Sequence, residues 1–309
     1  MTTDRPAPRT PLLTALRGVC PIPAVAFFDD ERLDVDSFLA GIADIAEAGA
    51  QSLMWPGFAS EYHKLSAAEI ALLRTELMAV AQSLGLRVII AVQDHATRLA
   101  VEHAQQAMAA GAAGINLLPP HFLGPSAQQV ADHISTVCTA LGDGQLVLQF
   151  APGFTGSTLT IDSVLDCAAA HRNLVAVKVE TSSLGPAVRR LTDAGLAATV
   201  GAAGLHLIEA FGAGAVGVQP GAGFTRLYVD IWRRLVDGDL ESARAAHTAL
   251  LPAIGRWMDS VEHILAADKA VLQRRGVFRS AAVRRPGRAL DPEDLAWIDI
   301  IVGAVGQLS

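Results

Sequence analysis

Eight short apolar runs alternate with eight longer amphipathic stretches along most of the chain. The apolar runs are Gly18–Phe28, Ser52–Gly57, Arg87–Gln93, Gly114–Pro120, Gln145–Ala151, Val175–Thr181, Ala197–Gly201 and Ala215–Gln219. The amphipathic stretches are Asp34–Ala48, Ser66–Leu84, Thr97–Ala110, Ser126–Leu141, Thr160–His171, Leu184–Ala194, Leu205–Phe211 and Thr225–Val236. Strands that alternate with helices predict a parallel sheet covered by helices. Eight such units fit a closed (β/α)8 TIM barrel, an α/β fold.

An open, doubly wound sheet is the competing arrangement for the same pattern. That fold usually carries a glycine-rich phosphate-binding turn directly after its first strand. Here the first apolar run ends in Phe27-Phe28-Asp29-Asp30, so this turn is missing. The sequence therefore favours the barrel.

Three further helical stretches follow the eighth unit. These are Leu240–Met258, Val261–Arg275 and Pro292–Val305. No low-complexity linker separates them from the barrel units, so we expect them to pack on the barrel. The predicted layout is an N-terminal tail over residues 1–16, a barrel over 17–238 and a C-terminal helical extension over 239–309.

Composition and charge narrow the class of protein. Apolar residues make up 51% of the 309 residues, which is typical of a globular chain with a large core. The formal net charge of −7 argues against a nucleic-acid-binding face, and Arg284, Arg285 and Arg288 form only a short basic patch, interpreted as a solvated loop. No apolar stretch reaches the about 20 residues that span a membrane. Residues 1–11 have no apolar signal core, so we expect a cytoplasmic protein.

The cysteines and histidines show no metal-binding pattern. Cys20, Cys138 and Cys167 are scattered along the chain and are interpreted as small core residues. No pair of histidines at helical spacing joins a nearby carboxylate, and Asp94-His95 alone is a weak signal. We expect neither a metal nor a cofactor.

One lysine stands out. The chain has three lysines, Lys64, Lys178 and Lys269, and the second lies in the apolar run 174–181. A buried strand is an unfavourable place for an ammonium group. A lysine in such a place can lose its proton and attack a carbonyl group as a neutral amine, which arginine does not do. Lys178 therefore suggests imine-forming catalysis, whereas Lys269 is expected on a helix surface or at a subunit contact.

In a barrel, alternate residues of each strand face the inside and the surrounding helices. The pattern places Val175, Val177 and Val179 toward the helices, and Ala176, Lys178 and Glu180 toward the inside. Barrel active sites lie at the C-terminal ends of the strands, where Lys178 and Glu180 fall. A buried ion pair between Lys178 and Glu180, without catalysis, is the alternative explanation of the same residues.

Five segments in order resemble one enzyme family. They are Gly57-Phe58-Ala59-Ser60-Glu61, Leu118-Pro119-Pro120-His121-Phe122, Pro152-Gly153-Phe154-Thr155-Gly156, Asn173-Leu174-Val175-Ala176-Val177-Lys178 and Gly214-Ala215-Val216-Gly217-Val218. From about Leu16 to Gly303, the chain resembles the dihydrodipicolinate synthase / N-acetylneuraminate lyase family of class I aldolases. The resemblance implies a (β/α)8 barrel with a C-terminal helical extension and a Schiff base between a 2-oxo acid such as pyruvate and Lys178. It also implies a homo-oligomer, a dimer or tetramer.

The departures from the family pattern concern its acid/base groups. Phe58 and Ala59 replace two loop threonines, Phe122 and Gln149 replace two tyrosines, and Phe154 replaces an arginine. The acid that often follows the lysine directly is displaced to Glu180. The resemblance therefore keeps the nucleophile and loses most of the usual proton-transfer groups.

The sequence predicts a Schiff-base-forming lyase, a retro-aldolase or dehydratase of a 2-oxo acid other than a true dihydrodipicolinate synthase. Lys178 is the expected nucleophile, with Glu180 and Gln149 as the other catalytic residues and His121 or Tyr62 as helpers in proton transfer. The expected substrate-binding residues are Gly57, Phe58, Ala59, Ser60, His121, Phe122, Phe154 and Gly201. Glu61 is expected to hold its loop. The alternative is a catalytically degenerate member that binds a small oxo acid as a sensor or scaffold.

Overall fold

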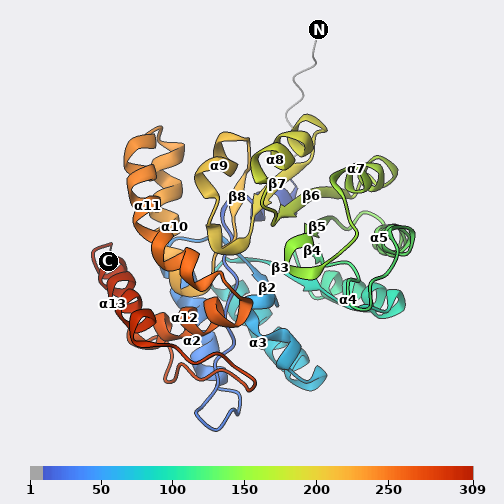
Figure 1. The fold of residues 1–309 in the computed structure, drawn as a ribbon. Helices are drawn as coiled ribbons and strands as arrows, with labels where there is room; N and C mark the ends of the chain where they lie inside the picture. The colour runs from blue at the N-terminus through green and yellow to red at the C-terminus, as the bar shows by residue number, and fades with distance from the viewer. Residues whose placement is uncertain (1–9, 309) are drawn as a thin grey trace.

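The computed structural model describes residues 10–308, and its centre is a barrel of eight parallel strands (Figure 1). The strands are β1 (Gly18–Val19), β2 (Ser52–Trp55), β3 (Arg87–Val92), β4 (Gly114–Leu117), β5 (Leu146–Phe150), β6 (Leu174–Val179), β7 (Ala197–Val200) and β8 (Gly217–Val218). They pair in the order β1-β8-β7-β6-β5-β4-β3-β2. The amide of Met54 in β2 donates to the carbonyl of Pro21, just after β1, at 3.0 Å and closes the ring. The predicted (β/α)8 fold is confirmed.

Helices surround these strands, as the ring of ribbons in Figure 1 shows. They are α2 (Val35–Glu47), α3 (Ala67–Ser83), α4 (Thr97–Ala109), α5 (Ala127–Leu141), α7 (Ile161–Ala170), α8 (Leu184–Asp193), α9 (Leu207–Gly212) and α10 (Thr225–Val236). Several begin at the residues that the sequence marks as caps. Ser66 caps α3 in a capping box with Glu69, and the Asp34 side chain accepts from the Ser37 amide at 3.1 Å to start α2.

Five short helices line the C-terminal side of the barrel. They are η1 (Phe58–Ser60), η2 (Tyr62–Lys64), α6 (Pro152–Thr155), η3 (Ala202–Gly204) and η4 (Ala222–Phe224). Each belongs to a connection after a strand, where the sequence predicted loops. They give the backbone around the C-terminal barrel mouth regular structure, whereas the hydrophobic periodicity of the sequence indicated no helix there.

The first strand is much shorter than predicted. β1 covers only Gly18–Val19, whereas the apolar run extends to Phe28. Pro21 and Pro23 lack the amide hydrogen that a strand ladder needs, and only isolated bridges continue the pairing, for example between Ile22 and Gly221. Most residues of the run remain buried. Its apolar character therefore comes from a position in the core and does not indicate a long strand.

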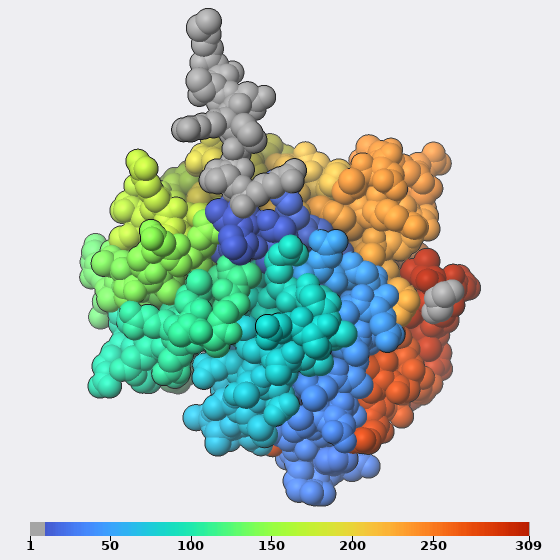
Figure 2. All heavy atoms as spheres, turned by 180° about the vertical axis from the view of Figure 1, so that it is seen from behind, coloured from blue at the N-terminus to red at the C-terminus, as the bar shows by residue number. Residues whose placement is uncertain are grey.

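A small apolar cluster fills the inside of the barrel, separate from the main core between strands and helices. Ala176 belongs to the inner cluster, while Val177 and Val179 belong to the outer core, as the alternation predicted. The prediction is wrong for Val175, which packs against the inner cluster at a register shift between Leu174 and Ala176. Helix α1 (Pro11–Ala15) closes the N-terminal end of the barrel with the fully buried Leu12. Figure 2 shows this segment, in dark blue, at the centre of the face opposite that of Figure 1.

The expected N-terminal tail is therefore shorter than residues 1–16. Residues 1–9 lie outside the described part of the chain, and a helix that packs into the barrel replaces the tail from Pro11 onward. Its apolar side chains explain the difference: Leu12 and Leu16 are fully buried, and they add to the inner cluster rather than face solvent.

The C-terminal extension consists of α11 (Leu240–Trp257), α12 (Val261–Arg274) and α13 (Pro292–Gly306), which lie against one side of the barrel (Figure 1). Helix α12 contacts η1 and η4, so the extension reaches the loops at the C-terminal barrel mouth. The sequence predicted all three helices to within one or two residues. No helix within residues 10–308 is long and apolar enough to cross a membrane.

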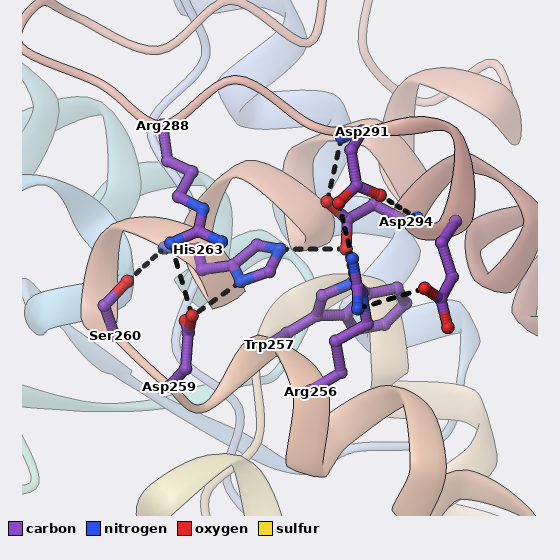
Figure 3. A network of polar contacts seen from close by, with 9 residues as sticks. Arg256, Trp257, Asp259, Ser260, His263, Arg288, Asp291 and Asp294 are labelled. Atoms are coloured by element: carbon purple, nitrogen blue, oxygen red, sulfur yellow. Dashed lines mark hydrogen bonds and ion pairs between the residues drawn. The ribbon is translucent and has the colours of Figure 1, made fainter.

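A buried carboxylate ties the three added helices together (Figure 3). Asp294 of α13 is 1% exposed and accepts from Arg256 Nε at 2.7 Å and from Trp257 Nε1 at 3.1 Å. His263 Nε2 lies 2.9 Å from the same oxygen, and its Nδ1 lies 2.9 Å from Asp259. Burial opposes ionisation of Asp294, but these donors and the Asp291 amide hold its pKa below the ordinary value. The network fixes the corner between α11 and α12.

Candidate active site

Lys178 lies at the C-terminal end of β6 and is 2% exposed. Its Nζ is 3.4 Å from Oε1 of Glu180, and both side chains face the inside of the barrel mouth. In the sheet, Gln149 of β5 and Thr199 of β7 stand beside Lys178 in register. The barrel thus places the amine where β5, β6 and β7 meet at their carboxyl ends.

Three donors hold the Glu180 carboxylate. Gln149 Nε2 donates to Oε2 at 2.7 Å, the Ala202 amide donates to Oε1 at 3.0 Å, and Lys178 forms the ion pair. Gln149 is itself fixed, because its Oε1 accepts from Asn116 Nδ2 at 3.0 Å. Glu180 is therefore a rigid partner of Lys178, and Gln149 has both ends of its amide engaged.

A small cavity of about 60 Å³ adjoins Lys178. It is lined by Ile22, Phe58, Ala59, Phe154, Lys178, Glu180, Ala202, Ala203, Gln219, Pro220, Gly221, Met258, Val261, Ile264 and Asp268. The walls are mostly apolar, and the polar groups are one amine, two carboxyls and one amide. Such a site suits a small molecule with a few polar atoms.

The cavity brings together only some of the predicted site residues. Phe58, Ala59 and Phe154 line it beside Lys178 and Glu180. Gly57, Ser60, Gln149 and Gly201 do not line it but support residues that do. For example, Ser60 Oγ accepts from the Gly57 amide at 3.1 Å and donates to the Pro23 carbonyl at 2.6 Å.

His121 and Phe122 lie apart from this cavity. The His121 ring contacts the His95 ring at 4.7 Å between centroids, and Phe122 is 70% exposed. Tyr62 packs beside Phe58 at 5.9 Å but also does not line the cavity, and burial raises its pKa to about 12. None of these three side chains lines the Lys178 cavity, because the loops after β2 and β4 direct them elsewhere: Tyr62 to the space between α3 and α4, His121 to His95, and Phe122 to solvent.

A larger cavity of about 360 Å³ lies between α3 and α4. It contains Tyr62, Arg74, Asp94 and His103, with His103 Nδ1 2.7 Å from Asp94 Oδ2. Lys178 does not line it. We place the candidate active site at the smaller cavity, because the buried amine of Lys178 and the buried carboxyl groups of Glu180 and Asp268 line it. A larger volume does not by itself indicate a catalytic site.

The expected position of Lys269 is wrong. This lysine is fully buried in α12, its Nζ forms an ion pair with the fully buried Glu61, and it lies 4.2 Å from the centroid of the Phe27 ring. Helix α12 is buried on all sides over residues 263–272, so it has no solvent face here for Lys269. Glu61 has a left-handed backbone with φ of 51° and anchors the loop that carries Phe58 and Ala59, the loop-holding position predicted for it.

The basic patch is also only partly a solvated loop. Arg285 is exposed, but Arg284 is mostly buried and forms a bidentate contact with Glu69. Arg284 also donates its backbone amide to Glu61 at 3.1 Å. The C-terminal segment therefore braces the same loop as Lys269.

Two polar residues of the cavity escaped the sequence analysis. Gln219 follows β8 and has a buried Oε1 without a hydrogen-bond partner among the described residues. Asp268 precedes Lys269 in α12 and is 1% exposed. The available signal for Asp268 was that segment 264–272 is apolar on every face apart from Asp268 and Lys269, which is typical of a buried helix.

The cysteines are buried and free, and burial raises the pKa of Cys20 to about 11 and of Cys138 to about 12. Their thiols therefore stay protonated and behave as core residues, as predicted. No group of three His, Cys, Asp or Glu side chains in residues 10–308 is placed to hold a metal ion.

The sequence model of the Dihydrodipicolinate synthetase family matches residues 15–302. The chain belongs to this family. It is 32% identical over 263 residues to a 4-hydroxy-tetrahydrodipicolinate synthase of Sorangium cellulosum, with 84% of this chain and 85% of the relative covered. It is 26% identical to an L-2-keto-3-deoxyarabonate dehydratase of Azospirillum brasilense, with 91% of each chain covered.

The fold of this dihydrodipicolinate synthetase family member agrees with a solved structure. The crystal structure of a dihydrodipicolinate synthase from Rhodopseudomonas palustris matches it with a TM-score of 0.83 and 27% identity, covering 95% of this chain and 98% of the other. The named relatives are synthases and dehydratases, and the chain is accordingly a lyase of this family.

Proposed function

We propose that this protein is a Schiff-base-forming lyase that acts on a small 2-oxo acid, either as a retro-aldolase or as a dehydratase. One observation carries the proposal: a buried lysine, at the carboxyl end of β6, lines a cavity together with its carboxylate partner. A synthase and a dehydratase among the relatives support a lyase of either kind.

The proposed reaction begins when the neutral Lys178 amine attacks the 2-oxo carbon. The adduct takes up one proton and loses water, and the resulting protonated imine withdraws electrons from carbon 3, so no cofactor is needed. Glu180 positions the amine, and Phe58 and Phe154 exclude water from the imine. No arginine of the described chain lines the cavity, so the neutral donor available to the substrate carboxylate is Nε2 of Gln219, which in the unliganded protein lies 3.9 Å from Met54 Sδ.

The test is borohydride trapping with pyruvate, 2-oxobutanoate and a 4-hydroxy-2-oxo acid, followed by mass mapping. We expect one reduced adduct, on Lys178. Mapping is unambiguous, because only Lys64 and Lys269 offer other lysine side chains. An absence of adduct with every acid, or an adduct on either other lysine, contradicts the proposal.

Turnover measured in the same samples separates the enzyme from the degenerate alternative. Phe58, Ala59 and Phe154 in the lining favour that alternative, since their side chains have no group that can give or accept a proton. A member that only binds its oxo acid gives the Lys178 adduct without release of product, whereas a lyase gives both.

Gly201→Ala is expected to damage the site without touching the substrate. A Cβ at this position lies 2.1 Å from Glu180 Oε1, so Glu180 must move and lose its bond from the Ala202 amide. We expect exchange of the carbon-3 protons of pyruvate in D2O to slow by about 100-fold, the order of effect that a 1 Å misplacement causes. Gly212→Ala, where a Cβ meets nothing within 4 Å, is the matched control. Equal rates in the two variants contradict the positioning role of Glu180.

A further inference from the structure

The Lys178 cavity contains a second buried carboxyl group, which comes from outside the barrel. Asp268 belongs to α12 of the C-terminal extension, and it lines the cavity with Lys178, Glu180 and Gln219. Its exposure is 1%, so it does not serve as a solubilising surface charge. Buried acids without a strong partner are rare in proteins and call for a physical explanation.

The two oxygens of Asp268 differ in their contacts. Oδ1 accepts from the Gly223 amide at 2.8 Å, whereas Oδ2 is buried and has no hydrogen-bond partner among residues 10–308. Asp268 also forms no ion pair within these residues, because the adjacent Lys269 is paired with Glu61. One oxygen is thus held by the backbone, and the other is free to hold or to receive a proton.

The backbone makes room for this carboxyl group. A Cβ at Gly221 lies 2.6 Å from Asp268 Oδ1, and a Cβ at Gly223 lies 3.0 Å from the same atom. Both glycines follow β8, at the mouth of the barrel. The side chain therefore fits only because the segment after β8 has no side chain at either position, which indicates a built position rather than an accidental burial.

Glu180 is a poor candidate for moving protons, because three donors already occupy its two oxygens. We propose that Asp268 is the proton-transfer group of the Lys178 cavity and takes over, from the C-terminal extension, the role of the tyrosines that Phe122 and Gln149 replace. This inference rests on the proposed imine chemistry and adds the group that imine chemistry lacks.

The proposed step is a proton transfer at carbon 3 of the protonated imine. The Asp268 carboxylate accepts the proton, the electrons of the carbon–hydrogen bond form a bond between carbons 2 and 3, and the electrons of the carbon–nitrogen double bond return to the Lys178 nitrogen. The products are the enamine and the neutral Asp268 acid. The reverse step returns a proton to carbon 3, so one carboxyl group serves both directions.

The charge environment suits this exchange near neutral pH. Burial raises the pKa of Asp268 to about 7, against lowering by the Gly223 and Ala222 amides and by Arg275 and Lys269. Lys178 and Glu180, one charge of each sign, line the same cavity. A general base is most effective when its pKa is close to the working pH.

The test compares Asp268→Asn with the wild type in two measurements. With pyruvate in D2O, we expect Asp268→Asn to keep the borohydride adduct on Lys178 and to slow carbon-3 exchange by about 10²- to 10⁴-fold. The wild-type exchange rate should rise as the pH increases through about 7, because Asp268 then loses its proton and becomes the base. Asp268→Asn should not show this rise. Asp299→Asn, at an exposed carboxylate of α13, is the matched control and should leave exchange unchanged.

A second measurement follows the proton in the unliganded protein. Between the ordinary value of 3.8 and about 7, folded Asp268 keeps a proton that the unfolded chain releases. Its contribution to the free energy of unfolding is therefore fully present below 3.8 and is lost as pH rises toward about 7. Asp268→Asn should lack this loss, and Asp299→Asn should show it as the wild type does.

The outcomes separate the two proposals. If the wild type forms no adduct, the imine chemistry fails, and the role of Asp268 fails with it. If the wild type forms the adduct but Asp268→Asn exchanges carbon-3 protons within about threefold of the wild-type rate, only the role of Asp268 is overturned. Identical pH dependence of stability in wild type and Asp268→Asn also overturns it, since the carboxyl then holds no proton near neutral pH.

Discussion

Lys178→Arg is expected to lose borohydride trapping completely and to lower turnover by about 10³-fold or more, the scale on which removal of a nucleophile acts. The guanidinium keeps the positive charge and the ion pair with Glu180, so the fold is expected to survive. It does not form an imine, because it stays protonated at accessible pH. The measurement is adduct yield and rate of product formation under saturating oxo acid.

Lys64→Arg is the matched control for this substitution. Lys64 pairs with Glu262 at 2.6 Å and with Glu61 at 3.3 Å, it does not line the cavity, and arginine keeps the positive charge that these two pairs need. It should leave both measurements near wild type. Retention of turnover in Lys178→Arg, with a circular dichroism spectrum like that of the wild type, shows that the lysine is only a counter-ion to Glu180 and ends the imine proposal.

Lys269→Met is expected to lower the free energy of unfolding by about 3–5 kcal/mol, the cost of removing one partner from a buried ion pair. Glu61 is fully buried and loses the cation at its Oε1, while Lys64 stays 3.3 Å from its Oε2. Burial lowers the pKa of Lys269 to about 8, although the negative charge of Glu61 acts in the opposite direction. The pair therefore lies in a strongly desolvated place, where an unpaired charge is costly. Urea unfolding measures the change.

Adding Glu61→Gln to Lys269→Met is expected to recover part of the loss, because no unpaired charge then stays buried. Arg190→Met is the control, since it breaks the exposed pair of Arg190 with Asp162 and should cost no more than about 1 kcal/mol. Equal effects of Lys269→Met and Arg190→Met are incompatible with a stabilising role for the buried pair. A recovered double variant with slow carbon-3 exchange shows that the pair also shapes the loop of Phe58 and Ala59.

The periodicity of the sequence predicted the barrel because each strand and helix buries a repeated apolar face. The same argument placed Lys178 inward on β6, since alternation along a strand is a local property. It overestimated β1, because apolar character reports burial and does not report the missing amides of Pro21 and Pro23. The homo-oligomeric state and the cytoplasmic location stay predictions.

The wall of the cavity was harder to predict than the nucleophile. Asp268 and Lys269 are adjacent in sequence, yet one lines the cavity and the other pairs with Glu61, because successive helix residues point about 100° apart. Which loops they meet depends on how α12 docks on the barrel. His121 fell outside for the same reason, because the path of its loop is set by tertiary contacts.

The corner between α11 and α12 has a consequence for any attempt to move this site into another protein. Met258, Val261 and Ile264 come from that corner, and the polar network around Asp294 holds it in place. A transplant of the eight strands with their loops carries the amine but leaves one side of its chamber open to bulk water. The barrel is therefore not a separable catalytic module, and a working graft must include the helical corner that supplies this part of the cavity wall.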